Sequence, residues 1–209
     1  ASYKTLHDKY ATSLVAYDQE YADYDDLLFL SDKQGDVIFS TASSSDFGLR
    51  VAEDLPESPI ADAWKQASAK GTTTISDLKP YGPAGDTPCQ FVATPIHGKD
   101  GTVGILAFRL SGTGIEAITD LRTGQGTTGE TILVGPDYLM RSNSLRDPVN
   151  HSVKAAFSDP DAGKVYTVAT KAVHEKKASG TDLIKDYIGN DVVVAYTPLQ
   201  VGDMTWALI

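Results

Sequence analysis

The sequence predicts an α+β fold, in which a long N-terminal helix precedes two modules, each an antiparallel sheet with flanking helices. Three observations support this prediction: tyrosines recur at helical spacing near the N-terminus, residues 89–110 form an apolar hairpin, and residues 191–209 repeat its layout. In both hairpins an apolar run reaches Thr-Pro followed by Ile or Leu, and a turn with Gly and Asp leads into a second apolar run. Such turns between β-branched and aromatic runs are a hairpin signal. The repetition indicates a module that occurs twice.

Residues 1–26 are expected to form the N-terminal helical segment, with the clearest helical pattern from residue 2 to about residue 24. Tyrosines fall at every seventh position within it: Tyr3, Tyr10, Tyr17 and Tyr24. This spacing places side chains along one face of a long helix. The face suits packing against the rest of the chain or, alternatively, a homodimer contact through the N-terminal helix.

The first module is expected at residues 27–121. A turn containing Gly35 separates its first two strands, Pro59 suits the first position of a helix, and Gly71 suits its end. The expected elements are strands at 27–31 and 37–41, a helix at 60–70, a strand at 72–78, the hairpin at 89–110 and a short helix at 114–121. Consecutive strands of this kind form an antiparallel sheet with helices on one side.

The second module is expected at residues 122–209. A turn at Gly135-Pro136-Asp137 separates its first two strands, and β-branched residues predict the later ones. The expected elements are strands at 131–134 and 138–142, a helical piece around 149–157, a strand at 165–169, a polar stretch at 171–179, a strand at 182–188 and the final strand pair. The module therefore repeats the plan of the first.

The composition excludes several partners. The 209 residues carry a net charge of -10 and their 18 Lys and Arg are scattered, with only Lys176 and Lys177 adjacent, so no basic stripe is available for a nucleic acid or an anionic membrane surface. The single cysteine, Cys89, excludes an internal disulfide. The chain starts within a helical pattern and stops within an apolar strand. We therefore expect it to be cut from a longer protein, with membrane contact only through flanking transmembrane segments outside this sequence.

No catalytic residue, metal site or cofactor is predicted. The four histidines lie far apart in the sequence, without metal-ligand spacing. Residues 124–129 match G-x-G-x-x-G, but they follow an expected helix and precede a strand, the reverse of a dinucleotide-binding turn. The acidic residues at 18–26 have a spacing that fits no calcium loop, so they indicate a solvated acidic face. Cys89 is typical of a small buried hydrophobic residue rather than a nucleophile.

Arg109 is the residue with the most chemical interest. Along the strand at 103–110, alternation places Ile105, Ala107 and Arg109 on one face of the sheet. An arginine at the end of an apolar strand can simply reach solvent. Alternatively, it points into the concave side of the sheet beneath the loop at 81–88, where its planar guanidinium would bind a carboxylate or a similar anion.

Four segments resemble the double Cache sensor domains. They are Tyr24–Leu30, Ser45–Gly48, Phe91–Ile96 and Gly129–Ser142, of which the last is the most specific. Double Cache domains are tandem PAS-like modules on the outer side of the membrane in bacterial chemoreceptors, sensor histidine kinases and related signalling proteins. The resemblance covers nearly the whole chain.

The resemblance implies a periplasmic sensor domain that binds a small molecule and catalyses no reaction. Residues 27–121 would be the membrane-distal, ligand-reading module, and residues 122–209 the membrane-proximal one. Some members recognise amino acids with a Tyr, an Arg-x-Trp pair and an Asp near the end of the last distal strand. Here no Arg precedes Trp64 at that spacing, and Arg109 stands at the position that resembles the Asp. A small anionic or neutral polar ligand is therefore expected.

The expected ligand-binding residues of the distal module are Arg109, Tyr81, Gln90, Thr94, Trp64 and Ala107, and a secondary pocket is expected at Arg141 and Ser142 of the proximal module. Two alternatives remain open at this stage. One is a structural dimerisation spacer whose pockets bind nothing, and the other is a stand-alone PAS-like enzyme, which would need a catalytic pair within reach of one pocket.

Overall fold

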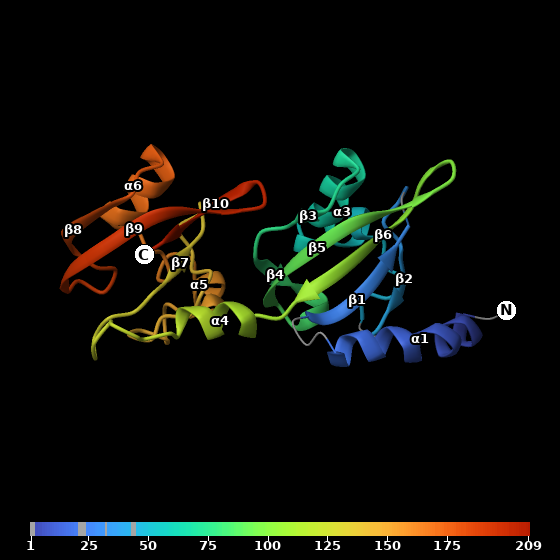
Figure 1. Cartoon of the computed structure of the whole chain (residues 1–209), viewed down its shortest axis with the longest axis horizontal. Coiled ribbons are helices and arrows are strands. Elements are labelled where there is room, and N and C mark those ends of the chain that lie inside the picture. The colour runs from blue at the N-terminus through green and yellow to red at the C-terminus, as the bar shows by residue number, and fades with distance from the viewer. Residues whose placement is uncertain (1–2, 21–23, 32, 43–44) are drawn as a thin grey trace. The chain divides into compact units, whose positions relative to one another are not determined.

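The computed structural model describes residues 3–20, 24–31, 33–42 and 45–209, with the backbone alone at residues 3, 6 and 17–20. The described residues form antiparallel sheets flanked by helices, which confirms the predicted α+β class (Figure 1). The chain divides into unit 1, residues 1–112, and unit 2, residues 113–209. Among the described residues, no helix has the length and apolar character needed to cross a membrane.

The described residues of unit 1 form a six-stranded antiparallel sheet in the order β2-β1-β6-β5-β3, with β4 paired to β5 beside this path. The predicted hairpin is confirmed as β5 and β6, joined by a tight turn that brings Gly98 opposite Gly101. Gly101 has a φ of +124°, a conformation that side chains disfavour. The strands are β1 (Tyr24–Leu30), β2 (Val37–Ser40), β3 (Thr74–Ile75), β4 (Lys79–Tyr81), β5 (Thr87–Gly98) and β6 (Gly101–Leu110).

The helices of unit 1 are α1 (Tyr3–Glu20), α2 (Val51–Asp54), α3 (Pro59–Lys70) and the short 3-10 helix η1 (Gly82–Ala84). The sequence predicted α3 well because both of its ends are locally specified. Ser58 accepts a hydrogen bond from the Ala61 N–H at 3.3 Å, Pro59 occupies the first turn, and Gly71 closes the helix at a φ of +66°.

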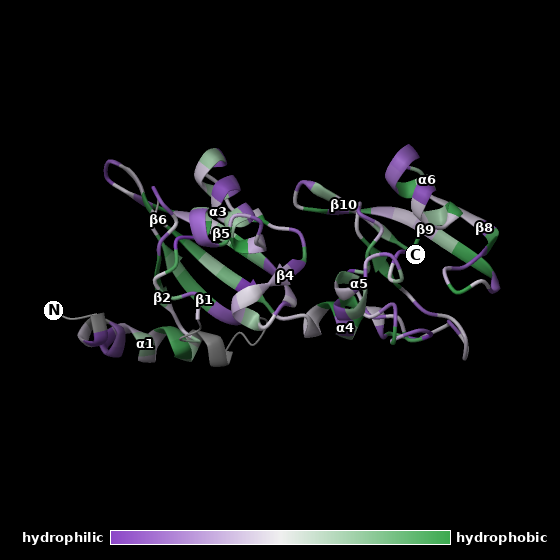
Figure 2. Ribbon diagram, turned by 180° about the vertical axis from the view of Figure 1, so that it is seen from behind, coloured by the Kyte–Doolittle hydropathy of each residue, from purple (hydrophilic) through white to green (hydrophobic). Residues whose placement is uncertain are grey.

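The core of unit 1 lies between α3 and one face of the sheet, here called the inner face. Strand alternation directs apolar residues of β1, β5 and β6 to this face, where they meet α3. Burial of each large apolar side chain contributes about 1.5–3 kcal/mol. Figure 2 shows the hydrophobic residues along β1 and β2 in green. The main members of this core are Leu28, Leu30, Ile60, Trp64, Phe91, Ala93, Ile105 and Ala107.

The N-terminal helix is shorter than the pattern predicted. Helix α1 ends at Glu20, and Tyr24 begins β1, where it lies opposite Leu110 of β6. Tyr24 therefore does not belong to a helical stripe of tyrosines, because the segment from Tyr24 gains sheet pairing with β6 and then with β2. The side chains of Tyr3 and Tyr17 lie outside the described residues, and Tyr10 is half exposed.

Unit 2 contains a four-stranded antiparallel sheet in the order β7-β10-β9-β8. The division between the units falls before the boundary expected after residue 121, so α4 is part of unit 2. The strand expected at 138–142 is reduced to one bridge between Met140 and Val134. The elements are α4 (Thr113–Thr119), β7 (Leu133–Val134), α5 (Val153–Ser158), α6 (Val168–Lys176), β8 (Gly180–Lys185), β9 (Asp191–Val201) and β10 (Met204–Leu208).

The strand predicted at 165–169 was wrong, because this segment enters helix α6. Thr167 and Thr170 form a capping box: the Thr170 N–H donates to Thr167 Oγ1 at 3.3 Å, and the Thr167 N–H donates to Thr170 Oγ1 at 2.9 Å. The helix then buries Ala169 and Val173 against the core of unit 2. Burial and the cap thus outweigh the preference of β-branched residues for strands.

We expect Thr167→Ala to lower the free energy of unfolding of unit 2 by about 1 kcal/mol, the usual cost of a lost N-cap. The two tryptophans, Trp64 and Trp206, lie in different units, so in a Trp64→Phe background Trp206 fluorescence follows unit 2 during urea unfolding. Lys176→Ala, at an exposed position of the same helix, is the control and should change little. Equal stability of the two variants would contradict the role of the cap.

Candidate functional site

Arg109 lies at the end of the inner face of unit 1, where it is mostly buried. Its side chain is 13% exposed, and its Nε lies 3.9 Å from Asp25 Oδ2. The guanidinium donates one long hydrogen bond, from Nη2 to the Asp25 carbonyl at 3.4 Å, and Nε donates to no described residue. A buried arginine normally uses its N–H groups fully. The Nε of Arg109 is therefore a buried donor without a described hydrogen-bond acceptor.

Tyr81 is fully buried beside this arginine. Its hydroxyl donates to Asp46 Oδ2 at 2.6 Å, and its ring meets the edge of Phe91 with centroids 5.1 Å apart. Burial raises the pKa of Tyr81 far above its usual range, and the nearby Asp46 carboxylate raises it further, whereas the charge of Arg109 lowers it. Tyr81 is therefore a permanent hydrogen-bond donor at physiological pH.

Two buried carboxylates lie near Tyr81, and their negative charges raise its pKa. Asp26, opposite Arg109 across the β1–β6 pair, accepts hydrogen bonds from the Ser40 and Thr41 hydroxyls and from the Ala42 N–H, at 2.9 to 3.0 Å. Asp46 accepts from Tyr81 as described. Neither aspartate was among the predicted site residues. Asp46 lies within Ser45–Gly48, one of the segments that resemble Cache domains. That resemblance could have marked Asp46 as a candidate site residue.

The other predicted residues divide between the two faces of the sheet. Ala107 lies in the core next to Arg109 along β6, and Trp64 packs in the same core while its Nε1 donates to the Ser31 carbonyl at 3.0 Å. Gln90 and Thr94 lie on the opposite face, because Phe91, between them on β5, faces inward and pairs with Arg109. The structure thus brings Arg109, Tyr81 and Ala107 together and separates them from Gln90 and Thr94.

Gln90 and Thr94 have local partners on their own face. Gln90 is buried, and its Nε2 donates to the Ser76 carbonyl at 2.9 Å. Thr94 accepts a hydrogen bond from the Thr73 hydroxyl at 2.9 Å. Their polar atoms serve the attachment of the segment around β3 to β5.

Arg141 and Ser142 of unit 2 have structural partners. Arg141 is 2% exposed, and it donates from Nη1 to the Leu139 carbonyl and from Nη2 to Asp137 Oδ2, both at 3.0 Å. Gly135 leaves the space that the guanidinium fills, since a Cβ there would lie 2.2 Å from Arg141 Cζ. Ser142 Oγ accepts from the Leu133 N–H at 2.9 Å. Neither residue lines the cavity of this unit.

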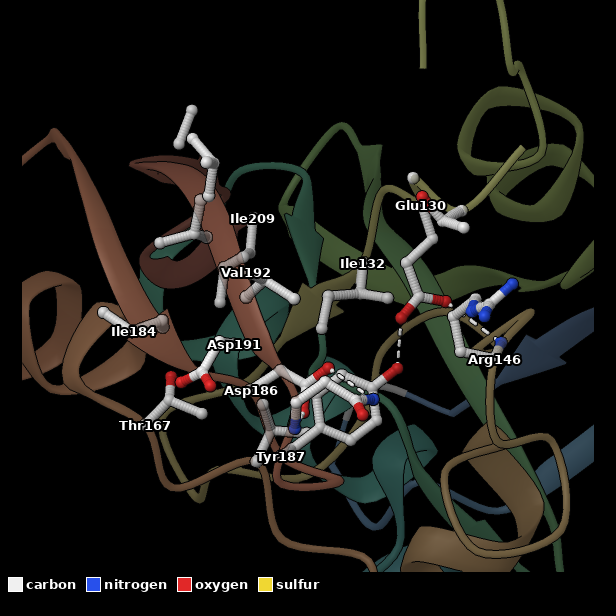
Figure 3. Close-up of a pocket in the computed structure, with 17 residues that line it drawn as sticks. Glu130, Ile132, Arg146, Thr167, Ile184, Asp186, Tyr187, Asp191, Val192 and Ile209 are labelled. Atoms are coloured by element: carbon white, nitrogen blue, oxygen red, sulfur yellow. Dashed lines mark hydrogen bonds between the residues drawn. The ribbon is translucent and has the colours of Figure 1, made fainter. Parts of the chain in front are cut away.

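The cavity of unit 2 has a volume of about 450 Å³ and lies against β8 and β9 (Figure 3). A hydrogen-bond network around Glu130 forms one of its walls. One carboxylate oxygen of Glu130 accepts from the Ser144 hydroxyl at 3.1 Å and from the Leu145 N–H at 2.9 Å, and the other accepts from the Tyr187 hydroxyl. Burial raises the pKa of Tyr187, and the hydrogen bond to Glu130 raises it further.

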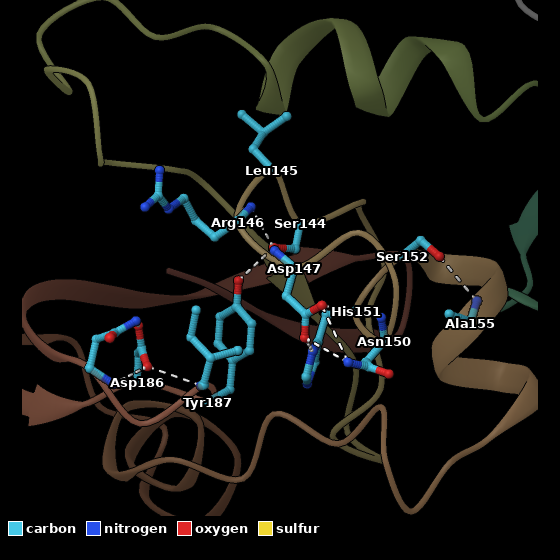
Figure 4. Close-up of polar contacts among 12 residues, drawn as sticks. Ser144, Leu145, Arg146, Asp147, Asn150, His151, Ser152, Ala155, Asp186 and Tyr187 are labelled. Atoms are coloured by element: carbon cyan, nitrogen blue, oxygen red, sulfur yellow. Dashed lines mark hydrogen bonds and ion pairs between the residues drawn. The ribbon is translucent and has the colours of Figure 1, made fainter.

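A second polar cluster lies beside Tyr187 (Figure 4). The Tyr187 hydroxyl is 2.7 Å from Ser144 Oγ, and the ring of His151 packs on the Tyr187 ring with centroids 4.5 Å apart. His151 Nδ1 lies 2.8 Å from Asp147 Oδ2. The hydrogen bond with His151 lowers the pKa of the Asp147 carboxyl. This cluster fixes the position of Tyr187 at the cavity wall.

A third feature is an apolar groove of about 640 Å³ in unit 1, on the face of the sheet opposite the core. It lies between α1 and the strands β1 and β2. Within it the ring of His7 stacks on the ring of Phe39, with the two ring centroids 5.1 Å apart. Tyr10 and Ile38 at its margin are 51% and 54% exposed.

Across residues 3–20, 24–31, 33–42 and 45–209, no three His, Cys, Asp or Glu side chains gather as metal ligands.

Comparisons with known proteins identify the fold. No protein-family model matches the chain, and no curated protein matches its sequence. An extracellular ligand-binding receptor from Desulfohalobium retbaense matches with a TM-score of 0.62 at 12% identity, over 91% of this chain and 30% of that one. The periplasmic sensory domain of the Campylobacter jejuni chemoreceptor Tlp1 gives a TM-score of 0.59 at 17% identity, over 100% and 79% of the two chains. The chain has the Cache-type sensor fold.

A third structural neighbour is the ligand-binding domain of the Pseudomonas aeruginosa amino acid chemoreceptor PctC, solved with GABA. It gives a TM-score of 0.55 at 14% identity, over 90% of this chain and 73% of that one. The three neighbours are extracellular, periplasmic or ligand-binding domains, and none is described as an enzyme. The predicted resemblance to Cache sensor domains is therefore confirmed at the level of the fold.

Cys89, near Arg109, should be unreactive in the folded protein. Burial raises the pKa of its thiol to about 11, with a smaller opposing effect from Arg109. At about pH 8 we expect a maleimide to label the native protein roughly 100-fold more slowly than the urea-unfolded chain, because thiolate is the reactive form. The rate is measured by mass spectrometry. Equal rates in the two states would contradict a buried, protonated thiol.

Proposed function

We propose that this chain is the extracytoplasmic ligand-binding part of a bacterial transmembrane signalling receptor, either a chemoreceptor or a sensor histidine kinase. Unit 1 is the membrane-distal PAS-like module and unit 2 the membrane-proximal one. The Cache-type fold supports this function, since the similar domains of known function are sensors. The chain spans only 30% of the Desulfohalobium receptor, and the output domain would belong to the rest of a longer protein.

The ligand site that we propose lies at Arg109 on the inner face of unit 1. The observation that supports it is the Nε of Arg109, a buried donor without a described hydrogen-bond acceptor in a side chain that is only 13% exposed. Buried N–H groups without acceptors are costly, so a ligand that supplies oxygen acceptors would bind there favourably. Tyr81 and Ala107 would form the adjacent wall. From the opposite face, Gln90 and Thr94 would act only by fixing β5.

The chemistry favours a small ligand that is anionic or neutral and polar. Asp26 and Asp46 already accept hydrogen bonds from neighbouring hydroxyls, so their oxygens have partners other than a ligand. A carboxylate or amide oxygen of a ligand would complete the coordination of the guanidinium. Ligand binding would then favour one of two arrangements of unit 1, and β6 or α1 would transmit the shift to the receptor. No reaction is proposed for this segment.

The proposed site predicts which variant loses ligand binding. In a thermal-shift screen of carboxylates, amides, amino acids, amines and nucleobases, a ligand at about 100 times its Kd adds about 2.7 kcal/mol of stability. For the compound that responds, Arg109→Gln should weaken the affinity measured by calorimetry by roughly 10- to 100-fold, the value of a charged hydrogen bond. Arg50→Gln, which removes two ion pairs at the surface of the same unit, is the matched control.

The alternatives give different results in the same experiment. A structural spacer would respond to no compound, and a ligand whose affinity is unchanged in Arg109→Gln would overturn the site while leaving the sensor function intact. A PAS-like enzyme would convert a responding compound, which chromatography of the mixture would reveal.

We also propose that the N-terminal helix contributes to a homodimer, as its tyrosine pattern suggested. The apolar groove beside α1 supports this proposal, because Tyr10 and Ile38 at its margin expose large apolar surface. Tyr10→Glu should shift the protein to the monomer in analytical ultracentrifugation, because a carboxylate cannot be buried there without a partner. Val103→Glu, at an exposed apolar position of β6, should leave the dimer intact. A wild-type chain that is monomeric at all concentrations would refute the dimer.

A further inference from the structure

The cavity of unit 2 has an apolar floor that no predicted role uses. Branched apolar side chains line it from four segments of the unit, as Figure 3 shows for Ile132, Ile184, Val192 and Ile209. Its volume of about 450 Å³ falls within the range of small-molecule sites, about 300–1000 Å³. The apolar floor of this cavity is suited to the hydrocarbon part of a ligand.

The three carboxylates at the cavity already have partners. Glu130 accepts hydrogen bonds from the Ser144, Leu145 and Tyr187 donors described above. Asp186 accepts from the backbone N–H groups of residues 188 and 190, at 3.0 and 2.8 Å. Asp191 forms an ion pair with Lys185, with 3.0 Å between Asp191 Oδ1 and Lys185 Nζ. These acids therefore hold the walls together, and they place negative charge around the opening.

Arg146 lines the cavity, and its guanidinium has free hydrogen-bond donors. Its backbone is fixed, since its N–H donates to Ser144 Oγ at 3.0 Å and, at 3.3 Å, to Glu130 Oε2. Its guanidinium makes no hydrogen bond or ion pair with any residue that the structure describes, and it lies exposed at the margin of the cavity. A guanidinium in this position can bind a carboxylate through two parallel hydrogen bonds.

We propose that unit 2 contains a second ligand site, which binds a monocarboxylate with an apolar chain. The carboxylate pairs with Arg146, and the chain lies on the floor formed by Ile132, Val192 and Ile209. A second negative charge on the ligand is disfavoured, because Glu130, Asp186 and Asp191 would repel it. This site is independent of Arg109 and of the ligand proposed for unit 1.

The test uses four probes of similar length on the whole chain: hexanoate, adipate, hexanamide and hexylamine. Calorimetry should detect binding of hexanoate. Adipate should bind at least roughly tenfold more weakly because the three acids repel its second carboxylate, hexylamine because Arg146 repels its ammonium group, and hexanamide because it lacks a charge to pair with Arg146. Arg146→Gln should weaken hexanoate binding roughly 10- to 100-fold. Lys154→Gln removes an exposed cation from α5, outside the cavity, and Arg109→Gln removes the arginine of unit 1. Both should bind hexanoate as the wild type does.

Methyl NMR locates the binding. Hexanoate should shift the Ile132 and Ile209 signals, which line the cavity, and leave those of Ile60 and Ile105 in the core of unit 1 unchanged. Val192→Phe, which fills the cavity from β9, should abolish the shifts. The proposal fails if hexanoate does not bind, if hexylamine binds more tightly, or if Arg146→Gln retains full affinity. Loss of binding in Arg109→Gln alone would move the hexanoate site to unit 1.

Discussion

The pairing of β1 with β6 is the constraint on which unit 1 depends. It places Leu28 opposite Ala107 and Leu30 opposite Ile105 in the core, and in the same register it sets Asp26 opposite Arg109. A shift of one residue would turn the core side chains outward and separate this carboxylate from the inner face. Apolar packing therefore fixes the position of the charged groups, and the free energy that holds Arg109 in place comes mainly from the aliphatic residues beside it.

In unit 2 the equivalent constraint is a carboxylate rather than a strand pair. Glu130 receives donors from the loop at 144–146 and from Tyr187 after β8, so it joins segments that are far apart in the sequence. Hydrogen bonds to a charged acceptor are stronger than neutral ones, and they are worth most where water is excluded. The short strand β7 offers little pairing of its own. The hydrogen bonds of Glu130 therefore hold together the part of the cavity wall that is not formed by the sheet.

The sequence predicted those features that depend on neighbouring residues. The β5–β6 hairpin and helix α3 carry their turn and cap residues within themselves, and both were found. Helix α6 was missed because its β-branched residues favour a strand until the Thr167–Thr170 cap and the burial of Val173 are counted. The partner of Tyr81 could not be inferred from spacing, since Asp46 is 35 positions away. Alternation placed Arg109 with Ala107, but it did not reveal that Gln90 and Thr94 face away, because that depends on which residue of β5 pairs with Arg109.

Three arginines of this chain illustrate what distinguishes a structural cation from a binding one. Arg141 is the most buried, yet its donors reach Asp137 and the Leu139 carbonyl, so an added anion would have to displace existing partners. Arg109 is less buried and has one long hydrogen bond. Arg146 is exposed, but its backbone is held by Ser144 and Glu130. Burial alone would rank Arg141 first as a binding residue. Binding requires donors that are both positioned by the fold and unsatisfied by it, and this criterion selects Arg109 and Arg146 instead.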